Sequence, residues 1–321
     1  MTRSAAILIT GATGGLGRRV AVTLAEAGRE LVVWGRRPEA VSAMCTQLRE
    51  LGAARARPIV ADLADLHAVR RALDELDGLP LQGIVANAGL TTIRDQRSAQ
   101  GFELTFAVNV LAHQLVLSRL RHALVPGARV VVLSSGTHEP DNRLARLSGI
   151  PVPRWVGPHA LALPDQAPEA QRLRDGRQRY STSKLGNVLQ ARALQAVLRH
   201  ENRDADVFAL DPGLMIDTDL VRELPAPLRW IFRGLGYLLT PVVDNMRLST
   251  TSSRHVVDLL DAPRWHGRGF EYLDGDRAKP PSPDAQRDDL AAELWRECTT
   301  LLELDEDPDC QIDAWLALQR L

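Results

Sequence analysis

Only two lysines stand among the 39 Lys and Arg residues of this 321-residue chain, and one of them, Lys184, follows one of three tyrosines, Tyr180, by four residues. Arginine is always charged and presents a rigid fork, whereas lysine offers a compact ammonium with three donors, so a site that needs a point charge keeps lysine. On a helix these two residues share a face, and the ammonium would favour the ionised phenol. The spacing therefore predicts a tyrosine that acts as an acid or base near neutral pH.

A second motif is the glycine-rich segment after the first apolar run. Residues 10–17 read TGATGGLG, in which glycines permit a tight turn and let the backbone of the following helix approach a pyrophosphate. A glycine-rich turn that binds nothing is the alternative. Its place at the first strand-to-helix connection favours dinucleotide binding.

The elements that position these motifs alternate between short apolar runs and longer helical patterns. The expected strands cover 5–10, 31–34, 56–61, 83–88 and 129–134, and the expected helices between them cover 15–27, 38–51, 65–76 and 100–124. Continuous apolar strands separated by helices predict an α/β protein with one doubly wound, Rossmann-type parallel sheet, helices on both faces and ligands at the carboxyl ends of the strands.

This rhythm breaks over residues 140–178, which are rich in Pro, Arg, Asp and Gln and form an insertion before Tyr180. The elements expected after it are a helix at 180–199, a strand at 206–211, an apolar substrate lid at about 214–245, a helix at 248–260, a strand at 269–273 and a helix at about 284–303. We therefore predict one domain over residues 1–303 and a C-terminal extension over 304–321.

Taken together, the motifs resemble the short-chain dehydrogenase/reductase family over roughly residues 4–275. The resemblance is carried by TGATGGLG, Asp62-Leu63, Asn87-Ala88-Gly89, Asn109, Ser135, Tyr180-x-x-x-Lys184 and Pro212-Gly213. The segment YSTSKLGNVLQARAL, the long insertion and the C-terminal PSPDAQRDDLAAELWREC are similar to the branch that contains retinol dehydrogenases and light-dependent protochlorophyllide reductases.

The resemblance implies a nicotinamide cofactor. Its candidate contacts are Gly11, Thr13, Gly15, Leu16, Gly17, Asp62, Leu63, Asn87, Ala88, Gly89, Tyr180, Lys184, Pro212, Gly213 and Thr218. Asp62 and Leu63 would bracket the adenine, although Asp62 could also be a helix N-cap. The family usually places a threonine four residues after the glycine of Pro-Gly; here Asp217 stands there, and the next residue, Thr218, becomes the candidate for the nicotinamide carboxamide.

The end of the second strand predicts the cofactor type. A carboxylate there accepts from the adenosine ribose in NAD enzymes, whereas an arginine accommodates the 2′-phosphate of NADP. This chain has Arg36 and Arg37 and no acid at that place, so we predict NADP(H), although the two arginines could simply reflect an arginine-rich composition.

For catalysis the resemblance assigns Tyr180 as general acid/base, while Lys184 would bind the nicotinamide ribose and lower the pKa of the phenol. Ser135 would orient the substrate oxygen, with Ser134 as the alternative. Asn109 would hold a water that links the lysine to solvent; without that relay it is a buried polar residue at a helix irregularity.

Other classes of function find little support in the sequence. No G-x-S-x-G motif surrounds a serine, and the eight histidines lack metal-type spacing, so neither a hydrolase nor a metal site is expected. A net charge of -1 gives no reason to expect nucleic acid. The three cysteines, the apolar strand at the N-terminus and the lack of a long apolar run predict a cytoplasmic protein without disulfides, signal peptide or membrane span.

The sequence thus predicts an NADP(H)-dependent oxidoreductase that interconverts a bulky apolar ketone or aldehyde and its alcohol. Two alternatives stay open: a redox-inactive NADP-binding sensor or scaffold, and a double-bond reductase of the protochlorophyllide reductase type, which is less favoured because residues 136–297 contain no cysteine. The family resemblance also implies a homodimer, paired through the helices at 100–124 and 180–199.

Overall fold

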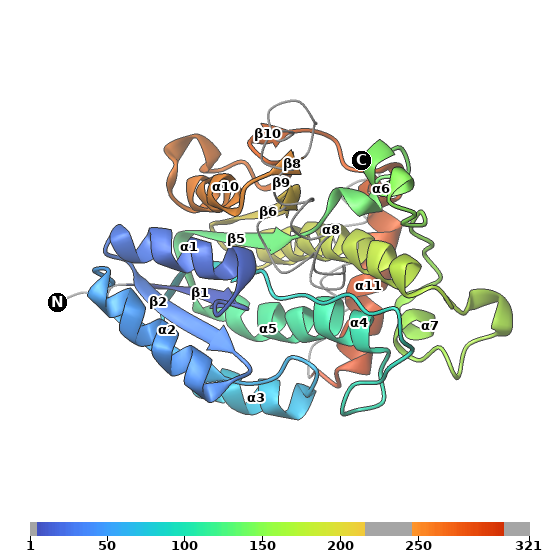
Figure 1. The fold of residues 1–321 in the computed structure, drawn as a ribbon, viewed down its shortest axis with the longest axis horizontal. Coiled ribbons are helices and arrows are strands. Elements are labelled where there is room, and N and C mark those ends of the chain that lie inside the picture. The colour runs from blue at the N-terminus through green and yellow to red at the C-terminus, as the bar shows by residue number, and fades with distance from the viewer. Residues whose placement is uncertain (1–4, 216–245, 305–321) are drawn as a thin grey trace, which may run out of the picture.

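The computed structural model describes residues 5–215 and 246–304, and in them the chain forms one eight-stranded sheet with helices on both faces (Figure 1). The strand order is β10-β9-β6-β5-β4-β1-β2-β3, and all neighbours are parallel except β10, which pairs antiparallel with β9. The strands are β1 (Ala6–Thr10), β2 (Glu30–Gly35), β3 (Arg55–Val60), β4 (Leu81–Ala86), β5 (Leu124–Leu133), β6 (Ala205–Asp211), β9 (Phe270–Asp274) and β10 (Arg277–Ala278). A separate parallel pair joins β7 (Leu214–Met215) to β8 (Met246–Arg247).

Two hydrophobic cores sandwich the sheet, as its apolar strands require. One core packs helices α1, α2 and α10 against one face, and the other packs α3, α5, α8 and α11 against the opposite face. The helices are α1 (Gly15–Glu26), α2 (Pro38–Glu50), α3 (Leu66–Asp74), α4 (Leu104–Phe106), α5 (Ala112–Leu120), α6 (Arg143–Leu147), α7 (Pro158–Ala162), α8 (Gly176–His200), α10 (Ser249–Asp261) and α11 (Asp288–Leu301). The doubly wound fold predicted from the sequence is confirmed.

Three helices differ most from their predicted extents. Helix α11 begins at Asp288, four residues after its expected start at about 284. Helix α8 begins at Gly176, four residues before its expected start, because the Asp175 side chain caps it by accepting from the backbone N–H of Arg177 at 2.8 Å. The helix expected at 100–124 is instead α4 and α5 joined by a π-helix, Ala107–Leu111, with Asn109 at its centre. A π-helical turn frequently marks a functional site because it redirects backbone groups.

The insertion before Tyr180 packs along α8 and α11. Ser181 in α8 donates to the carbonyl of Pro151 at 2.8 Å, and the Thr182 hydroxyl accepts from the N–H of Arg154 at 3.0 Å. Farther along, the Trp155 indole donates to Glu293 of α11 at 2.7 Å. These bonds fix the insertion beside the first turns of the helix that carries Tyr180.

Helix α11 covers the helices through which a family-type homodimer would pair. It packs against both α8 and α5, and Leu294, Trp295 and Cys298 on it are fully buried. A dimer through the faces of α5 and α8 that α11 occupies would have to displace a helix that belongs to the core. A homodimer stays a prediction.

Candidate active site

The glycine-rich turn lies between β1 and α1, at the carboxyl edge of the sheet. Gly11 has φ +67°, which favours glycine, and a Cβ on Gly17 would lie 2.5 Å from both the Asn87 amide nitrogen and the Gly11 carbonyl. Gly15 opens α1 and faces open space, so the first N–H groups of the helix are accessible. The Thr13 side chain lies next to Gly35 at the end of β2. Leu16, in the first turn of α1, is buried. This cradle fits a dinucleotide pyrophosphate.

Arg36 and Arg37 follow β2 at the same edge, and both are exposed. No carboxylate of the described residues pairs with either guanidinium, so both are available to an anion. Two exposed guanidiniums at this place suit a phosphate better than a ribose hydroxyl.

Asp62 follows β3, and its carboxylate accepts from the N–H of Ala64 at 3.0 Å in a local turn. It is not the cap of α3: Asp65 is, accepting from the N–H groups of His67 and Ala68. The N-cap interpretation of Asp62 is therefore wrong, because the chain makes one more turn before the helix begins. The exposed Asp62 and the buried Leu63 stand at the carboxyl edge of the sheet.

Asn87, Ala88 and Gly89 follow β4 and tie it to β1. The hydroxyl of Thr10 accepts from the N–H groups of Asn87 and Ala88, each at 3.0 Å, while the Asn87 amide donates to the Thr10 carbonyl at 2.8 Å. A Cβ on Gly89 would lie 3.6 Å from the Lys184 ammonium nitrogen. Gly89 therefore brings the strand end that would line the cofactor next to the lysine.

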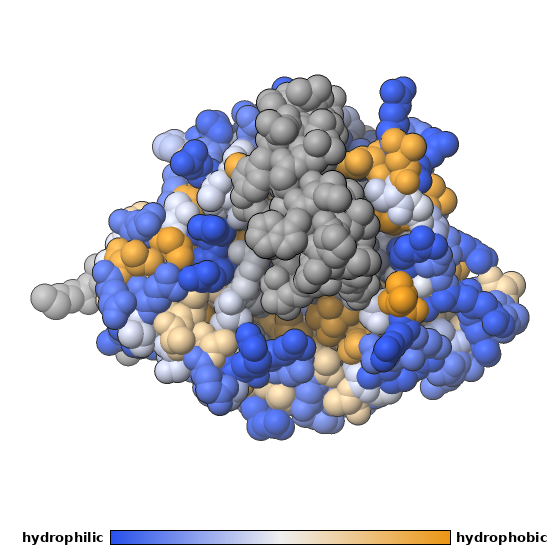
Figure 2. Space-filling view, in the orientation of Figure 1, coloured by the Kyte–Doolittle hydropathy of each residue, from blue (hydrophilic) through white to orange (hydrophobic). Residues whose placement is uncertain are grey.

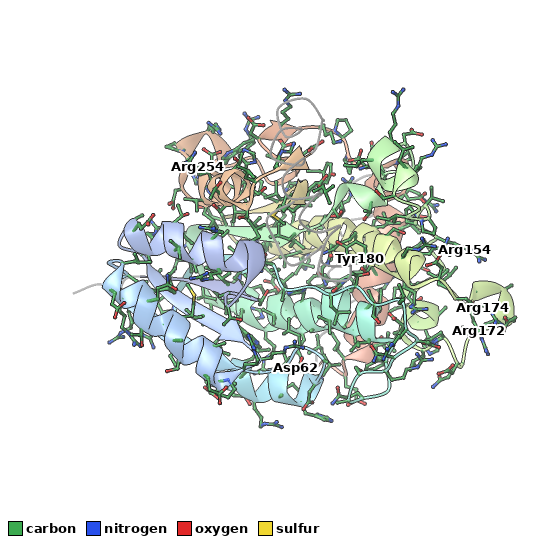
Figure 3. All side chains as sticks on the ribbon, in the orientation of Figure 1. Asp62, Arg154, Arg172, Arg174, Tyr180 and Arg254 are labelled. Carbon is green, nitrogen blue, oxygen red and sulfur yellow. The ribbon has the colours of Figure 1, made fainter. Side chains whose placement is uncertain are left out.

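Tyr180 and Ser135 meet across the sheet edge. Tyr180 lies in the second turn of α8, near the middle of the molecule, whereas Arg154, Arg172 and Arg174 lie toward its periphery (Figure 3). The side chain of Ser135, just after β5, lies close enough to the Tyr180 phenol to lower its pKa. Its neighbour Ser134 points elsewhere and donates to the backbone carbonyl of Lys184 at 2.8 Å. The structure thus brings Ser135, and not Ser134, to the tyrosine.

Lys184 is buried one turn after Tyr180. Its ammonium nitrogen lies 5.7 Å from the centroid of the Tyr180 ring and donates to the Leu133 carbonyl at 3.0 Å and to the Asn187 side-chain oxygen at 3.1 Å. An ammonium has three donors, so one is left for a ligand. The sequence alone did not predict Asn187 as a partner of Lys184. The feature that could have indicated it is an amide side chain three residues after Lys184, in a helix whose middle is otherwise largely apolar.

Comparison with known proteins agrees with this geometry. A family model described as short chain dehydrogenase matches residues 5–143. Polyprenol dehydrogenase of Mus musculus is 30% identical over 299 residues, which are 90% of this chain and 81% of that protein. Chloroplastic protochlorophyllide reductase A of Oryza sativa subsp. japonica is 30% identical over 239 residues, 69% of this chain and 60% of that protein.

This chain belongs to the short-chain dehydrogenase/reductase family. The fold is shared with a short chain dehydrogenase from Burkholderia cenocepacia J2315, solved in complex with NADP, which superposes with a TM-score of 0.60 at 22% identity, covering 85% of this chain and 97% of that one. The resemblance to the branch containing protochlorophyllide reductases is likewise confirmed.

The Tyr180–Lys184 pair differs in one respect from the sequence expectation. Burial raises the pKa of Tyr180 to about 12; the Ser135 side chain lowers it in part, and the charge of Asp211 raises it further. Burial also lowers the pKa of Lys184 to about 8, partly offset by the attraction of Asp211. The chain by itself therefore does not lower the pKa of the phenol, because desolvation outweighs the favourable contacts.

Asp211 ends β6 directly before Pro212-Gly213. Its carboxylate is buried and accepts from the N–H of Gly213 at 2.9 Å, where Gly213 has φ +80°, and the Pro212 carbonyl accepts from the Ser252 hydroxyl at 2.7 Å. The turn is thus fixed on both sides. Thr218 and residues 216–245 of the predicted lid lie outside the described residues, as does most of the C-terminal extension.

The described residues also bear on a metal site and a membrane span. Within residues 5–215 and 246–304, no group of three or more His, Cys, Asp or Glu side chains is placed to hold a metal ion. Over the same ranges no helix has the length and apolar character that crossing a membrane requires.

Proposed function

We propose that this chain is an NADP(H)-dependent oxidoreductase that interconverts a bulky apolar ketone or aldehyde and its alcohol, with Tyr180 as the acid/base. The observation that carries the proposal is the joining of Ser135, Tyr180 and Lys184 beside a glycine-rich turn that fits a dinucleotide. A protein that only binds the cofactor has no need of this set of side chains.

Each side chain has a distinct part in the reaction. When bound, NADPH supplies the hydride. The Tyr180 phenol gives its proton to the substrate oxygen as negative charge develops there, and the Ser135 hydroxyl donates a hydrogen bond to the same oxygen. Lys184 would hold the nicotinamide ribose with its remaining donor and contributes positive charge to the site. The glycine-rich turn would hold the pyrophosphate.

The protonation state of Tyr180 suits it to donate a proton. With a pKa of about 12 in the chain alone, Tyr180 is protonated near neutral pH. In the reverse reaction the same residue would act as the base, so the proposal covers both the carbonyl and its alcohol.

The cofactor choice rests on Arg36 and Arg37, whose exposed side chains follow β2. Replacing Arg36 by Ala should weaken NADPH binding about tenfold or more, because a charge-assisted bond to a phosphate is lost. NADH, which lacks the 2′-phosphate, should bind nearly as before. Arg55→Ala is the matched control, since this exposed arginine opens β3 at the opposite edge of the sheet. Titration of cofactor fluorescence measures both affinities, and equal losses for NADPH and NADH would remove the proposed role of Arg36.

An apolar substrate is supported by the surface around the first turn of α8. Ile93, Leu147 and Val152 are 67%, 87% and 48% exposed, and Figure 2 shows a hydrophobic group in the region of α6, which carries Leu147. Ile93 lies next to Gly176, where a Cβ would be 2.6 Å from the Ile93 Cα. Gln178 donates to the Val152 carbonyl at 3.2 Å. Ile93 and Val152 therefore both flank the start of α8. The name of the mouse relative, polyprenol dehydrogenase, makes a long isoprenoid aldehyde or alcohol the first substrate to test.

The experiment is a titration of the protein with NADPH and NADH, followed by a substrate panel monitored at the absorbance of reduced nicotinamide. Selective NADPH binding and its oxidation by a long apolar aldehyde or ketone are expected, with slower turnover of a short ketone. NADPH binding without turnover across the panel would favour a sensor instead, and failure to bind either cofactor would overturn the proposal.

A further inference from the structure

A continuous set of hydrogen bonds joins Lys184 to the π-helix that contains Asn109. The Asn187 side-chain oxygen accepts from the Lys184 ammonium at 3.1 Å, and its nitrogen donates to the Asn109 backbone carbonyl at 2.6 Å. Asn187 is 1% exposed. One carboxamide therefore spans the distance between the lysine and that carbonyl within the protein interior.

The orientation of this carboxamide is dictated by its partners. An ammonium can only donate and a carbonyl can only accept, so the oxygen of Asn187 must face Lys184 and its nitrogen must face Asn109. The reversed amide would place donor against donor and acceptor against acceptor. The arrangement is thus fixed by chemistry and holds the ammonium in one place.

The other acceptor position of the Asn109 carbonyl is also used. His113 Nδ1 lies 3.2 Å from that carbonyl and must carry the proton there, which leaves Nε2 to accept from the Thr10 hydroxyl at 3.0 Å. A carbonyl oxygen has two lone pairs, and here the two donors come from His113 and Asn187. The carbonyl is therefore satisfied by side chains of the chain itself.

We propose that Asn187 is a positioning residue for Lys184, and that its carboxamide takes the place of the water by which the family resemblance links the lysine to Asn109. Asn187 makes a protein-only connection in which the ammonium is held by Leu133 and Asn187. The inference rests on the proposed oxidoreductase for its catalytic consequence, but the geometry of the lysine can be measured without turnover.

The charge on Lys184 provides that measurement. The charged and titratable groups that face it are Asp211 from β6, which favours the ammonium, Tyr180 on its own helix, and His113 from α5, whose pKa burial lowers to about 4. His113 is therefore neutral near pH 7. Removing the oxygen of Asn187 takes away an acceptor that stabilises the charged form, so the pKa of Lys184 should fall.

Two substitutions at this position separate positioning from simple packing. Asn187→Leu has a similar size and excludes both hydrogen bonds, whereas Asn187→Ala leaves about the space of one water, which could bridge Lys184 and Asn109. Gln190→Leu is the matched control: Gln190 is buried one turn later on the same face and donates to the Val110 carbonyl and to Gln114, not to Lys184.

Selective labelling makes the lysine directly visible, because the chain contains only Lys184 and Lys279. In protein carrying [ε-¹³C]lysine, two signals are expected, and Lys279→Arg assigns them. A pH titration should give a pKa of about 8 for Lys184 in the unsubstituted protein, a lower value in Asn187→Leu, a value closer to the original in Asn187→Ala, and no change in Gln190→Leu.

Turnover with NADPH and a responsive substrate gives the second readout. Asn187→Leu should lower kcat roughly 10- to 100-fold, and the alkaline limb of its pH profile should move to lower pH, because the charged lysine is lost earlier. Asn187→Ala should retain more activity than Asn187→Leu, the reverse of what packing alone predicts.

The outcomes are distinguishable. An unchanged pKa of Lys184 in Asn187→Leu would overturn the proposal, as would equal pKa values in the Ala and Leu variants. If the Leu variant does not fold, Asn187→Ala carries the test: a pKa of Lys184 below that of the Gln190→Leu control supports the proposal, and a pKa equal to the control contradicts it. Absence of any NADPH oxidation by the unsubstituted protein would overturn the proposed function while leaving the lysine titration a valid test.

Discussion

Each of the two lysines lies beside a tyrosine ring at nearly the same distance. The ammonium nitrogen of Lys184 is 5.7 Å from the centroid of Tyr180, and that of Lys279 is 5.8 Å from the centroid of Tyr272. The partners of the two pairs differ. Lys184 donates to a backbone carbonyl and a neutral amide, whereas Lys279 makes ion pairs with Glu139 at 2.8 Å and Asp274 at 3.3 Å.

The polar neighbours of the tyrosines follow the same division. The Tyr180 phenol has the neutral Ser135 hydroxyl as its neighbour, which lowers the pKa of the phenol, whereas the Tyr272 phenol donates to the Glu139 carboxylate at 2.8 Å. Burial first, and then the charges of Asp211 and Glu139, raise the pKa of Tyr272 far above its usual value. Burial alone would lower the pKa of Lys279, but its bonds to Glu139 and Asp274 raise it.

This comparison shows that a lysine beside a tyrosine is not sufficient for proton chemistry. The Tyr272 phenol and the Lys279 ammonium both donate to the Glu139 carboxylate. These bonds hold β9 and the end of β10 against the segment that follows β5. The Lys184 ammonium hydrogen-bonds to neutral groups, and the Asp211 carboxylate acts on the Tyr180–Lys184 pair through its charge. We therefore expect the charge state of this pair to respond to a ligand, and the difference between charged and neutral hydrogen-bond partners separates a structural clamp from the pair proposed to be catalytic.

The largest difference is expected when each phenol is removed. Tyr180→Phe should lower kcat by about 10²- to 10⁴-fold, because the general acid is lost, while NADPH binding is largely kept. Tyr272→Phe should leave kcat within about twofold and lower the free energy of unfolding by about 1–2 kcal/mol, because the bond to Glu139 is lost. Steady-state NADPH oxidation and denaturant unfolding measure the two effects. Equal losses of turnover in both variants would remove the distinction.

Removing the polar neighbour of each tyrosine should give a smaller contrast. Ser135→Ala should lower kcat by about 10²-fold, since the donor to the developing oxyanion is missing. Glu139→Gln should leave kcat unchanged and lower the midpoint of thermal unfolding by a few degrees. Ser134→Ala controls for the neighbouring serine, which bonds to the Lys184 carbonyl. If Ser134→Ala loses more turnover than Ser135→Ala, the assignment of the serine is wrong.

The smallest effect concerns pH. Reduction requires both a charged Lys184 and a protonated Tyr180, and the lysine is the first to lose its proton, at a pKa of about 8. The kcat/KM for reduction should therefore be constant below that pH and fall by up to about tenfold per pH unit above it. Lys279→Arg should leave this limb in place. If the alkaline fall of kcat/KM shifts in Lys279→Arg, the titrating group is Lys279 and not Lys184.

Local signals predicted much of the fold and the residues of the candidate active site. Apolar strands, the glycine turn and the Tyr180–Lys184 spacing are all readable within a few residues, and the structure brings Ser135, Tyr180 and Lys184 together. The boundary of α8 was missed because its cap, Asp175, lies in a segment without periodicity. Asp65 caps α3 although Asp62 stands closer to the strand, which spacing alone does not distinguish.

Contacts between distant residues were not predictable in this way. Glu139 meets Tyr272 and Lys279 across more than 130 residues of chain, and Trp155 reaches Glu293 on α11 across a similar separation. Asn187 lies near Lys184 in sequence, yet its role depends on a π-helix that redirects the Asn109 carbonyl. Helix α11 was expected as an element, but its place over α5 and α8 follows only from the assembled fold.

The most direct test is to measure the pKa of Tyr180 with and without NADP⁺. The chain has three tyrosines, so protein carrying [ζ-¹³C]tyrosine should give three signals, which Tyr180→Phe and Tyr272→Phe assign. Tyr180 should titrate near 12 alone and at clearly lower pH with NADP⁺, because the oxidised nicotinamide adds positive charge, while Tyr272 should not respond. A Tyr180 pKa that NADP⁺ leaves unchanged would contradict it.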